Sequence, residues 1–369
     1  MKLKVLQENL NGSLAHLSKA IPNNPQLPVL SSVLITTENG ICTFSATDLY
    51  FGIRCSLVVD SETDGSIVVP GKQFREIVSS LDPGVLELLF KDNSLAIANT
   101  KTNISLAGSS THEYPPFPQV EGEEYVFPIE YLEQIENNII FSASTDQARP
   151  VLTAVLFVFN NSGLTCVSTD GFRLSTLIVD DTQKFESKTF LIPAKALSEV
   201  FKIASKLKVK EVRFKVSQEL KQVFFSLEGV EVFVRLIEGE YPPYERIIPS
   251  SFTTEVVFDT AELLEALKRA MIFARESSNI VRFEISENKV IIHSSSPSFG
   301  QYKGELQLVT ISGEQNEIAF NIKYLLDYLS VTKSEKQWFG MSESLKPALF
   351  IPENNKKQSY VVMPFKVNN

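Results

Sequence analysis

The chain is poor in cysteine and histidine and has no long apolar run. Its 369 residues include three cysteines, Cys42, Cys55 and Cys166, and no C-x-x-C pair. An odd and scattered set is atypical of a disulfide framework or a zinc site, so we expect three small buried hydrophobes. No stretch approaches the roughly 18 apolar residues that a membrane-spanning helix requires. The first residues become polar too early for a signal peptide, and we expect a cytoplasmic protein.

The common catalytic signatures are also missing. The sequence holds no Gly-x-Gly-x-x-Gly motif, no Walker loop and no Gly-x-Ser-x-Gly motif. His16, His112 and His293 are scattered and have no acidic or cysteine neighbours at metal-ligand spacing, so we expect structural roles for them. These absences favour a binding protein without metal or cofactor over an enzyme.

An internal repeat organises the chain. The run Pro-Val-Leu-Ser-Ser-Val-Leu at 28–34 starts 20 positions before Asp48, and the run Pro-Val-Leu-Thr-Ala-Val-Leu at 150–156 starts 20 positions before Asp170. The two copies lie 122 residues apart, which is close to a third of the chain. Such a period indicates repeated structural units rather than one large domain.

Two further pairs of segments support the repeat. Residues 68–72 and 191–195 each lead into a helical pattern, and residues 114–118 and 241–244 are proline-rich, as suits linkers. A third copy is weaker in sequence but keeps the order of elements. We therefore predict three domains, at 1–120, 121–248 and 249–369.

Hydrophobic periodicity predicts two helices and several strands in each unit. Strands are expected at 212–216, 230–234 and 281–285, and Asp259 with Thr260 can cap a helix. The predicted helices cover 8–20, 71–81, 129–143, 194–208, 259–275 and 321–334. Runs of strands between these helices indicate the α+β class rather than alternating β-α-β units.

Asp48 and Asp170 occupy equivalent positions of the repeat, each after a predicted strand. Aspartate commonly fixes a turn at such a position, which is the interpretation we favour. The alternative is a pair of catalytic carboxylates in an enzyme with an unrecognised site.

Charge is distributed unevenly along the chain. The net charge of −9, taken alone, argues against nucleic acid as a partner. In the six predicted helices, however, basic residues slightly outnumber acidic ones, and Lys195, Lys202 and Lys206 are spaced to share one helix face. Two interpretations stay open: ordinary solvated helices, or a surface that accepts phosphates on an otherwise acidic body.

Taken together, the motifs resemble the bacterial DNA polymerase III beta subunit family, the replication sliding clamps. The resemblance rests on the triple repeat and on segments 27–30, 169–174, 241–244 and 360–365, in the family's order. It implies three clamp-type domains, each with two helices packed on antiparallel β-sheets, and a ring made by a head-to-tail homodimer around duplex DNA. It also implies a non-catalytic processivity subunit that tethers the replicative polymerase. A scaffold that never encircles DNA is the rival interpretation.

The resemblance further implies a pocket for short glutamine- and leucine-containing peptides of polymerases, the clamp loader and repair proteins. The matching positions are Leu152, Thr169, Gly171, Phe172, Arg173, Leu174, Pro242, Arg246, Ile247, Val361, Val362, Met363, Pro364 and Phe365. Core packing is the alternative role for the apolar members. Phe172 and Phe365 replace a common histidine and methionine, and residues 366–369 run past the usual end, so we expect an altered peptide preference.

Two more surfaces follow from the resemblance. Positions expected to face DNA are Asn24, where some members have arginine, together with Lys72, Arg149, Lys195, Lys202, Lys206 and Lys268. At the dimer contact, Ile104 and Leu106 of one subunit are expected to meet Ile272 and Phe273 of the other. On the predicted helix, Ile272 and Phe273 point away from the face that carries Leu263 and Leu267.

Overall fold

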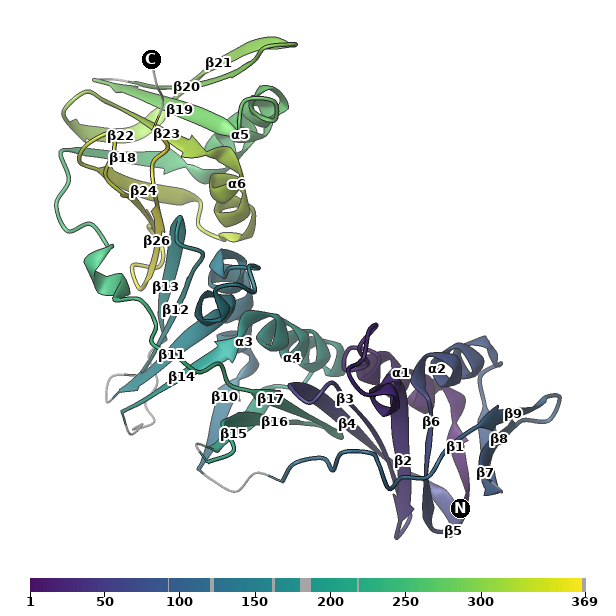
Figure 1. Cartoon of the computed structure of the whole chain (residues 1–369). Coiled ribbons are helices and arrows are strands. Elements are labelled where there is room, and N and C mark those ends of the chain that lie inside the picture. The colour runs from purple at the N-terminus through teal and green to yellow at the C-terminus, as the bar shows by residue number, and fades with distance from the viewer. Residues whose placement is uncertain are drawn as a thin grey trace. The chain divides into compact units, whose positions relative to one another are not determined.

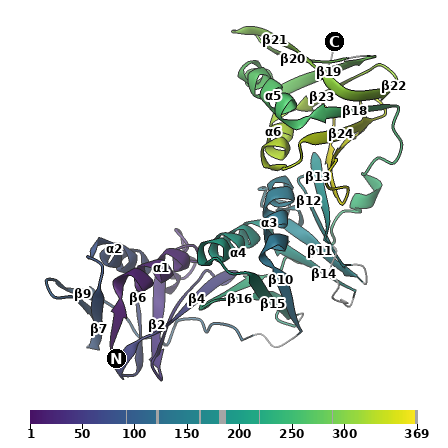
Figure 2. The same cartoon turned by 180° about the vertical axis from the view of Figure 1, so that it is seen from behind.

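The computed structural model describes residues 1–91, 93–119, 123–160, 163–179, 187–217, 219–287 and 289–366. The chain forms two compact units (Figures 1 and 2). Unit 1 contains Met1–Glu130 and Ala196–Leu236, and unit 2 contains Tyr131–Lys195 and Ile237–Asn369. No described helix has both the length and the apolar character needed to cross a membrane.

Unit 1 is built on two antiparallel sheets. The smaller has the strand order β5 (Asp60–Thr63), β1 (Lys2–Leu6), β7 (Val85–Lys91), β8 (Ser94–Ala98) and β9 (Asn103–Ala107). The larger has the order β10 (Glu124–Pro128), β15 (Glu211–Ser217), β16 (Gln222–Leu227), β17 (Val230–Arg235), β4 (Phe51–Val58), β3 (Ile41–Thr47), β2 (Ser32–Glu38) and β6 (Gly65–Pro70). Its helices are α1 (Gln7–Leu17), α2 (Gly71–Ser80) and most of α4 (Ala194–Leu207), and α1 packs on β3, β4 and α2.

Unit 2 has the same plan. Its larger sheet has the order β14 (Lys188–Pro193), β11 (Ala154–Asn160), β12 (Gly163–Thr169), β13 (Arg173–Val179), β26 (Gln358–Val362), β25 (Ala348–Pro352), β24 (Lys336–Met341), β18 (Thr254–Asp259) and β22 (Leu308–Gly313). The smaller sheet is β21 (Gly300–Leu306), β20 (Lys289–Ser296), β19 (Ile280–Ser286) and β23 (Asn316–Asn321). Most of α3 (Ile129–Asn138), α5 (Thr260–Ala274) and α6 (Ile322–Val331) belong to this unit, and α5 packs on β20, β21 and α6.

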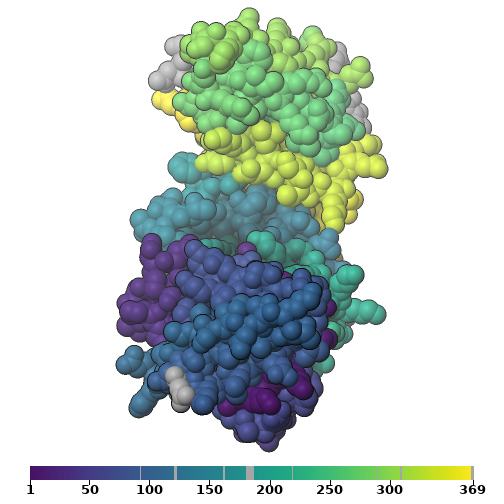
Figure 3. Space-filling model, turned by 90° about the vertical axis from the view of Figure 1, so that its right-hand side faces the viewer, coloured from purple at the N-terminus to yellow at the C-terminus, as the bar shows by residue number. Residues whose placement is uncertain are grey.

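Aromatic side chains fill much of the core of unit 2. Phe283, Phe320 and Phe339 are fully buried and contact one another in edge-on or tilted geometry. Tyr328 of α6 stacks on Tyr360 of β26 with ring centroids 4.4 Å apart. Each such ring removes a large apolar area from water, which stabilises the contact between helix and sheet. In the space-filling view, the yellow-green and yellow atoms of α6 and the last strands lie against the green atoms of the preceding strands (Figure 3).

The helix and strand predictions are largely confirmed. All six helices form, and the Asp259 carboxylate accepts a hydrogen bond from the Glu262 backbone N–H at 2.9 Å, as a capping residue does. The helix predicted for 129–143 ends earlier, at Asn138, because consecutive asparagines have low helix propensity, and a short 3-10 helix, η2 (Ile140–Ser142), follows. All three cysteines are buried and free, and burial raises the pKa of the Cys42 and Cys55 thiols to about 12.

The larger sheet of each unit joins strands from neighbouring copies of the repeat. In unit 1, β17 of the second copy pairs with β4 of the first, and in unit 2, β26 of the third copy pairs with β13 of the second. We call the β4–β17 junction the first seam and the β13–β26 junction the second seam. The predicted domain boundaries at 120 and 248 stay a prediction.

Candidate functional site

The predicted peptide pocket surrounds the turn between β12 and β13 at the second seam. The Thr169 hydroxyl donates to the Arg173 carbonyl at 2.6 Å and accepts from the Gly171 N–H at 3.0 Å. One Asp170 carboxylate oxygen accepts from the N–H groups of Phe172 and Arg173 at 2.9 and 3.1 Å. Asp170 is therefore a turn residue, as we favoured. Gly171 has φ +94°, and the turn leaves the Phe172 side chain 56% exposed.

The Arg173 side chain ties this turn to α6. Its Nε donates to Asp170 at 3.0 Å, and its Nη1 donates to Asp327 at 2.6 Å. The guanidinium carbon lies 4.7 Å from the centroid of the Tyr324 ring, which in turn stacks with Phe172 at 6.4 Å. Only a tenth of the Arg173 side chain is exposed, so these charged hydrogen bonds act with little competition from water.

Tyrosines beneath this arginine stay neutral. Tyr360 is fully buried, burial raises its pKa, and its hydroxyl donates to the Tyr324 carbonyl at 2.8 Å. Burial disfavours the charged Arg173 guanidinium, but the Asp327 and Asp170 carboxylates outweigh that effect and raise the pKa of Arg173. The second seam therefore holds a cation that is paired with two carboxylates.

The last described residues run along the turn. The Met363 N–H donates to the Phe172 carbonyl at 2.8 Å, and the Phe365 N–H donates to the Ala319 carbonyl at 2.7 Å. The Met363 and Phe365 side chains are exposed, and Pro364 between them is half-buried. Three large apolar side chains, those of Phe172, Met363 and Phe365, are thus held at the surface by backbone hydrogen bonds. Residues 367–369 of the C-terminal extension lie outside the described residues.

An apolar cluster lies beneath this surface. Leu174 and Val361 belong to it, and Leu152 and Val362 are also buried. Ile247 packs on the cluster from the linker, where Pro242 is half-buried and Arg246 is exposed at the end of η4 (Tyr244–Arg246). The cluster consists of Ala154, Leu156, Val167, Leu174, Leu191, Leu349 and Val361, with Val151, Val158, Ile237, Tyr241, Tyr244, Ile247, Ile248, Phe252, Trp338 and Ile351 partly buried on it.

Arg149 lies beside the same turn. Its Nη1 lies 3.2 Å from the point that a Cβ atom on Gly171 would occupy, and its Nε donates to Asp146 at 3.1 Å. The Ala148 N–H and Arg149 together lower the pKa of the Asp146 carboxyl. This placement beside the pocket was missed from the sequence. Tyr324 and Asp327 were missed as well, although their i, i+3 spacing in a predicted helix put them on one face.

The other residues predicted to face DNA are exposed on helices or their approaches. In unit 1, Lys72 is at the start of α2, Asn24 precedes η1 (Pro28–Ser31), and Lys202 and Lys206 lie on α4. Lys202 pairs with Glu199 at 3.0 Å, and Lys206 contributes, after burial, to a lowered pKa of His16 on α1.

In unit 2, two more lysines from the predicted DNA-facing set are exposed. Lys268 on α5 pairs with Glu265 at 2.8 Å, and Lys195 lies in the first turn of α4. Because the Lys268 pair is exposed to water, it stabilises the fold little.

The residues predicted for the dimer contact lie at sheet edges or beside them. Ile104 and Leu106 are half-buried on β9, an edge strand of unit 1. Ile272 is 59% exposed on α5, whereas Leu263 and Leu267 are fully buried, so the predicted orientation of Ile272 is confirmed.

Phe273 is half-buried, and its ring stacks with that of Tyr302 at 6.4 Å. Tyr302 belongs to β21, which is an edge strand of unit 2. Both β9 and β21 therefore have backbone groups on one side without a partner in the described chain.

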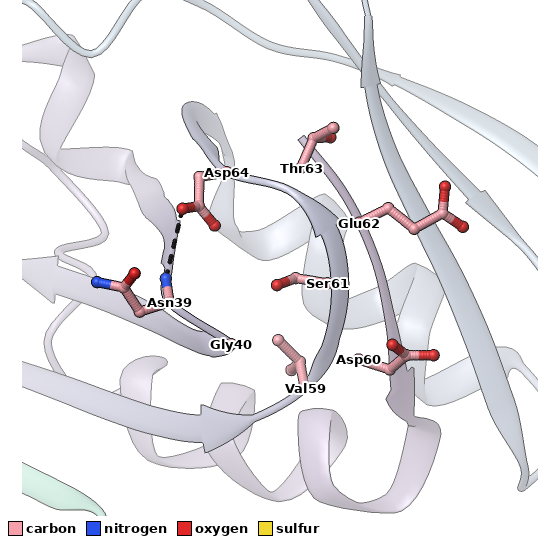
Figure 4. Close-up of a pocket in the computed structure, with 8 residues that line it drawn as sticks. All are labelled: Asn39, Gly40, Val59, Asp60, Ser61, Glu62, Thr63 and Asp64. Atoms are coloured by element: carbon pink, nitrogen blue, oxygen red, sulfur yellow. Dashed lines mark hydrogen bonds between the residues drawn. The ribbon is translucent and has the colours of Figure 1, made fainter.

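A polar depression of about 440 Å³ lies elsewhere in unit 1 (Figure 4). It is lined by Asn39, Gly40 and residues 59–64. Lys2 pairs with Glu62 at 2.7 Å, and the Asp64 carboxylate accepts from the Asn39 N–H at 3.4 Å. Over the part of the chain that the structure describes, no group of three or more His, Cys, Asp or Glu side chains is placed to hold a metal ion. This depression contains none of the predicted site residues.

Family models of the DNA polymerase III beta subunit match three consecutive parts of the chain. The N-terminal domain matches residues 1–118, the central domain residues 127–243 and the C-terminal domain residues 245–366. Among curated proteins, the beta sliding clamp of Bacillus subtilis (strain 168) is 28% identical over 99% of this chain and all of its own length. That of Synechocystis sp. is 29% identical over the full length of both.

Solved structures of this kind share the fold over the whole chain. The DNA polymerase III beta chain of Streptococcus pneumoniae TIGR4 gives a TM-score of 0.95 with 25% identity and covers 99% of this chain and all of its own. The DNA polymerase sliding clamp of Bacillus subtilis gives 0.94 with 28% identity over the full length of both.

Proposed function

Since this chain belongs to the DNA polymerase III beta subunit family and is a sliding clamp, we propose that it closes into a head-to-tail homodimeric ring around duplex DNA. It is a non-catalytic subunit that acts with DNA and the replicative polymerase. Its three repeated domains, with boundaries near 120 and 248, form the wall of the ring. Its place of action is the cytoplasm.

The proposed dimer joins β9 of one subunit to β21 of the next. Each is an edge strand whose outer side has no partner strand in the described chain. Two such edges that meet in antiparallel orientation satisfy one another's backbone groups. Ile104 and Leu106 on the first edge supply apolar surface, and Ile272 with Phe273 supplies it beside the second. Because the two surfaces differ, the contact is heterologous, and two such contacts close a ring of two subunits.

The proposed DNA contacts are made by the exposed basic residues of the helices. Lys72, Lys202 and Lys206 of unit 1, with Lys195 and Lys268 of unit 2, offer point charges to phosphates. Asn24 adds a polar contact. Contacts to phosphate carry no sequence information, which is what a protein that slides on DNA requires. The net charge of −9 shows that the basic residues are outnumbered elsewhere on the chain, which limits non-specific wrapping by nucleic acid.

The proposed partner site is the second seam. The observation that carries it is the exposed set Phe172, Met363 and Phe365, held rigidly above an apolar cluster. Aromatic and aliphatic side chains of a short peptide would bury this surface, and such anchors supply most of the energy of small interfaces. Arg149 lies beside it, and we expect Arg149 and the exposed Arg246 of the linker to donate hydrogen bonds to the peptide backbone.

Loading on circular DNA tests the proposed ring. The clamp is loaded on nicked circular DNA by a clamp loader, and the DNA is then linearised. We expect the protein to stay on the circle and leave the linear DNA, because its retention is topological. A scaffold that binds DNA without encircling it would be retained equally on both forms, and that result would refute the ring.

A further inference from the structure

The turn between β3 and β4 at the first seam repeats the turn of the proposed peptide pocket. The Thr47 hydroxyl donates to the Phe51 carbonyl at 3.1 Å and accepts from the Leu49 N–H at 2.9 Å. One Asp48 carboxylate oxygen accepts from the N–H groups of Tyr50 and Phe51 at 2.9 and 2.7 Å. Leu49 has φ +77°, close to the +94° of its counterpart, Gly171. The same backbone is therefore built twice.

The neighbouring strand is also repeated. β17 pairs with β4 as β26 pairs with β13, and the Arg235 N–H donates to the Tyr50 carbonyl at 2.7 Å. The counterpart is the Met363 N–H, which donates to the Phe172 carbonyl at 2.8 Å. Tyr50 and Phe172 are each 56% exposed. An aromatic side chain thus stands at the surface in the same place at both seams.

Exposed apolar side chains gather at both seams. The Leu236 N–H donates to the Lys221 carbonyl at 2.8 Å, which places the exposed Leu220 close to the end of β17. Leu27 precedes η1 as Arg149 precedes η3 (Pro150–Thr153). Among the large hydrophobic residues exposed in the described chain, Leu49, Tyr50 and Leu220 lie at the turn end of the first seam, and Phe172, Met363 and Phe365 lie at the turn end of the second. Such accumulation marks an interaction surface.

The charge of the first seam differs from that of the second. Phe51 takes the position of Arg173, so the first seam has no paired arginine beneath the turn. Further along β4, Arg54 pairs with Glu231 of β17, so the exposed and, in the described chain, unpaired cation beside the turn is Arg235, which lies 5.6 Å from the centroid of the Tyr50 ring. No ion pair to Arg235 forms among the residues that the structure describes. A guanidinium beside an exposed ring is a ready partner for a carboxylate.

We propose that the first seam is a second docking site, for a short peptide that combines an aromatic or aliphatic anchor with a carboxylate. The anchor would pack on Leu49 and Tyr50, and the carboxylate would pair with Arg235. This inference rests on the proposed function, because the peptide pocket at the second seam supplies the mode of binding. We expect weaker binding than at the second seam, because residues 117–119 of the linker form no counterpart of η4.

Peptide binding to the full chain tests this proposal. The probe is the peptide Gln-Leu-Asp-Leu-Phe with blocked ends and a photo-reactive group on the ring, and cross-links are mapped by mass spectrometry. The second seam is inactivated by ending the chain after Val362 or, as an independent variant, by Phe172→Asp. We expect both variants to keep cross-links at Tyr50 and residues 235–236, with an apparent Kd at least about tenfold weaker than that of the intact chain.

Charge reversal at the first seam gives the decisive measurement. In either inactivated chain, Arg235→Glu should weaken the remaining binding about tenfold or more, and Arg75→Glu, at an exposed position on α2, should leave it unchanged. A peptide with Asn in place of Asp should bind the first seam more weakly and respond little to Arg235→Glu.

The two proposals fail in different ways. If the intact chain binds the peptide and neither inactivated chain does, the first-seam site is overturned and the pocket at the second seam is supported. Residual binding that ignores Arg235→Glu would overturn it as well. Cross-links confined to the first seam of the intact chain would overturn the pocket instead, and a chain that binds no peptide would overturn both.

Discussion

At the first seam the turn presents Leu49 and Tyr50, whereas at the second seam the same turn presents Gly171 and Phe172. Gly171 leaves room for Arg149, whose Nη1 would meet an added Cβ atom at 3.2 Å. Leu49 fills the corresponding space with an exposed side chain at positive φ. The two seams therefore share hydrogen bonds and differ in what they offer a ligand, which shows that the duplicated backbone alone does not set specificity.

The seams also differ in how their charges are balanced. At the second seam Arg173 is almost buried, paired with Asp170 and Asp327, and positioned to hold the turn on α6. At the first seam Arg235 is exposed and sits on the ring of Tyr50. A paired and buried arginine stabilises its own surroundings, whereas an exposed one remains available to an incoming anion.

Substitutions at the dimer contact are expected to have the largest effect. They also test whether peptide binding at the seams is independent of the ring. Replacing both Ile272 and Phe273 with alanine should weaken the dimer by about 3 kcal/mol or more, since each side chain loses apolar area at the interface. Sedimentation at micromolar concentration should then show monomer. Peptide binding at both seams should persist, because each seam is complete within one unit. An unchanged sedimentation profile would refute the assigned interface.

Removal of the chain after Val362 is the next largest test. It deletes Met363 and Phe365 from the second seam only, and peptide affinity there should fall about a hundredfold, as expected for the loss of central anchors. Calorimetric titration measures the affinity, and sedimentation should still show a dimer. Unchanged affinity for the peptide would show that the pocket lies elsewhere.

Exchanging the residues at positive φ tests directly whether the two turns are equivalent. Gly171→Leu forces a side chain into the left-handed region against Arg149, and we expect a loss of about 1–2 kcal/mol in unfolding free energy with weaker peptide binding. The converse change, Leu49→Gly, relieves the same backbone conformation and should leave stability unchanged or raised by up to about 1 kcal/mol. Urea unfolding measures both. Equal destabilisation by the two variants would contradict the equivalence of the turns.

The smallest effect is expected from Asp327→Asn. This change removes one charged partner of Arg173 while Asp170 remains, so we expect a cost of about 1 kcal/mol in the stability of unit 2. Glu265→Gln, which breaks an exposed pair with Lys268, is the matched control and should cost a few tenths of a kcal/mol at most. A larger loss of stability in Glu265→Gln than in Asp327→Asn would show that the burial of Arg173 does not strengthen its ion pair.

Much of this architecture could be predicted from the sequence because it depends on local patterns. The six helices follow apolar periodicity, Asp259 caps α5, and the turns at Asp48 and Asp170 follow from spacing within the repeat. The burial of Leu174 and Val361 could not be predicted from the sequence, since burial depends on neighbours far along the chain.

Long-range pairing was the part that the sequence could not provide. Alternation identifies a strand but not its partner, so the joining of β4 to β17 and of β13 to β26 was out of reach. The same holds for Arg173 and Asp327, which are 154 residues apart in the chain and 2.6 Å apart in the structure. The proximity of Arg149 to Gly171 was likewise out of reach, because nothing local in the sequence links the two.

The position of β26 in the middle of its sheet has a consequence for biosynthesis. β13 and β25 both pair with this strand, which follows both of them along the chain. The larger sheet of unit 2 therefore cannot close until residue 362 has left the ribosome, whereas β17 lets the sheet of unit 1 close once residue 235 has done so. During that interval two edges in unit 2 are open to wrong pairing, and chaperones have their strongest reason to hold this half of the nascent clamp.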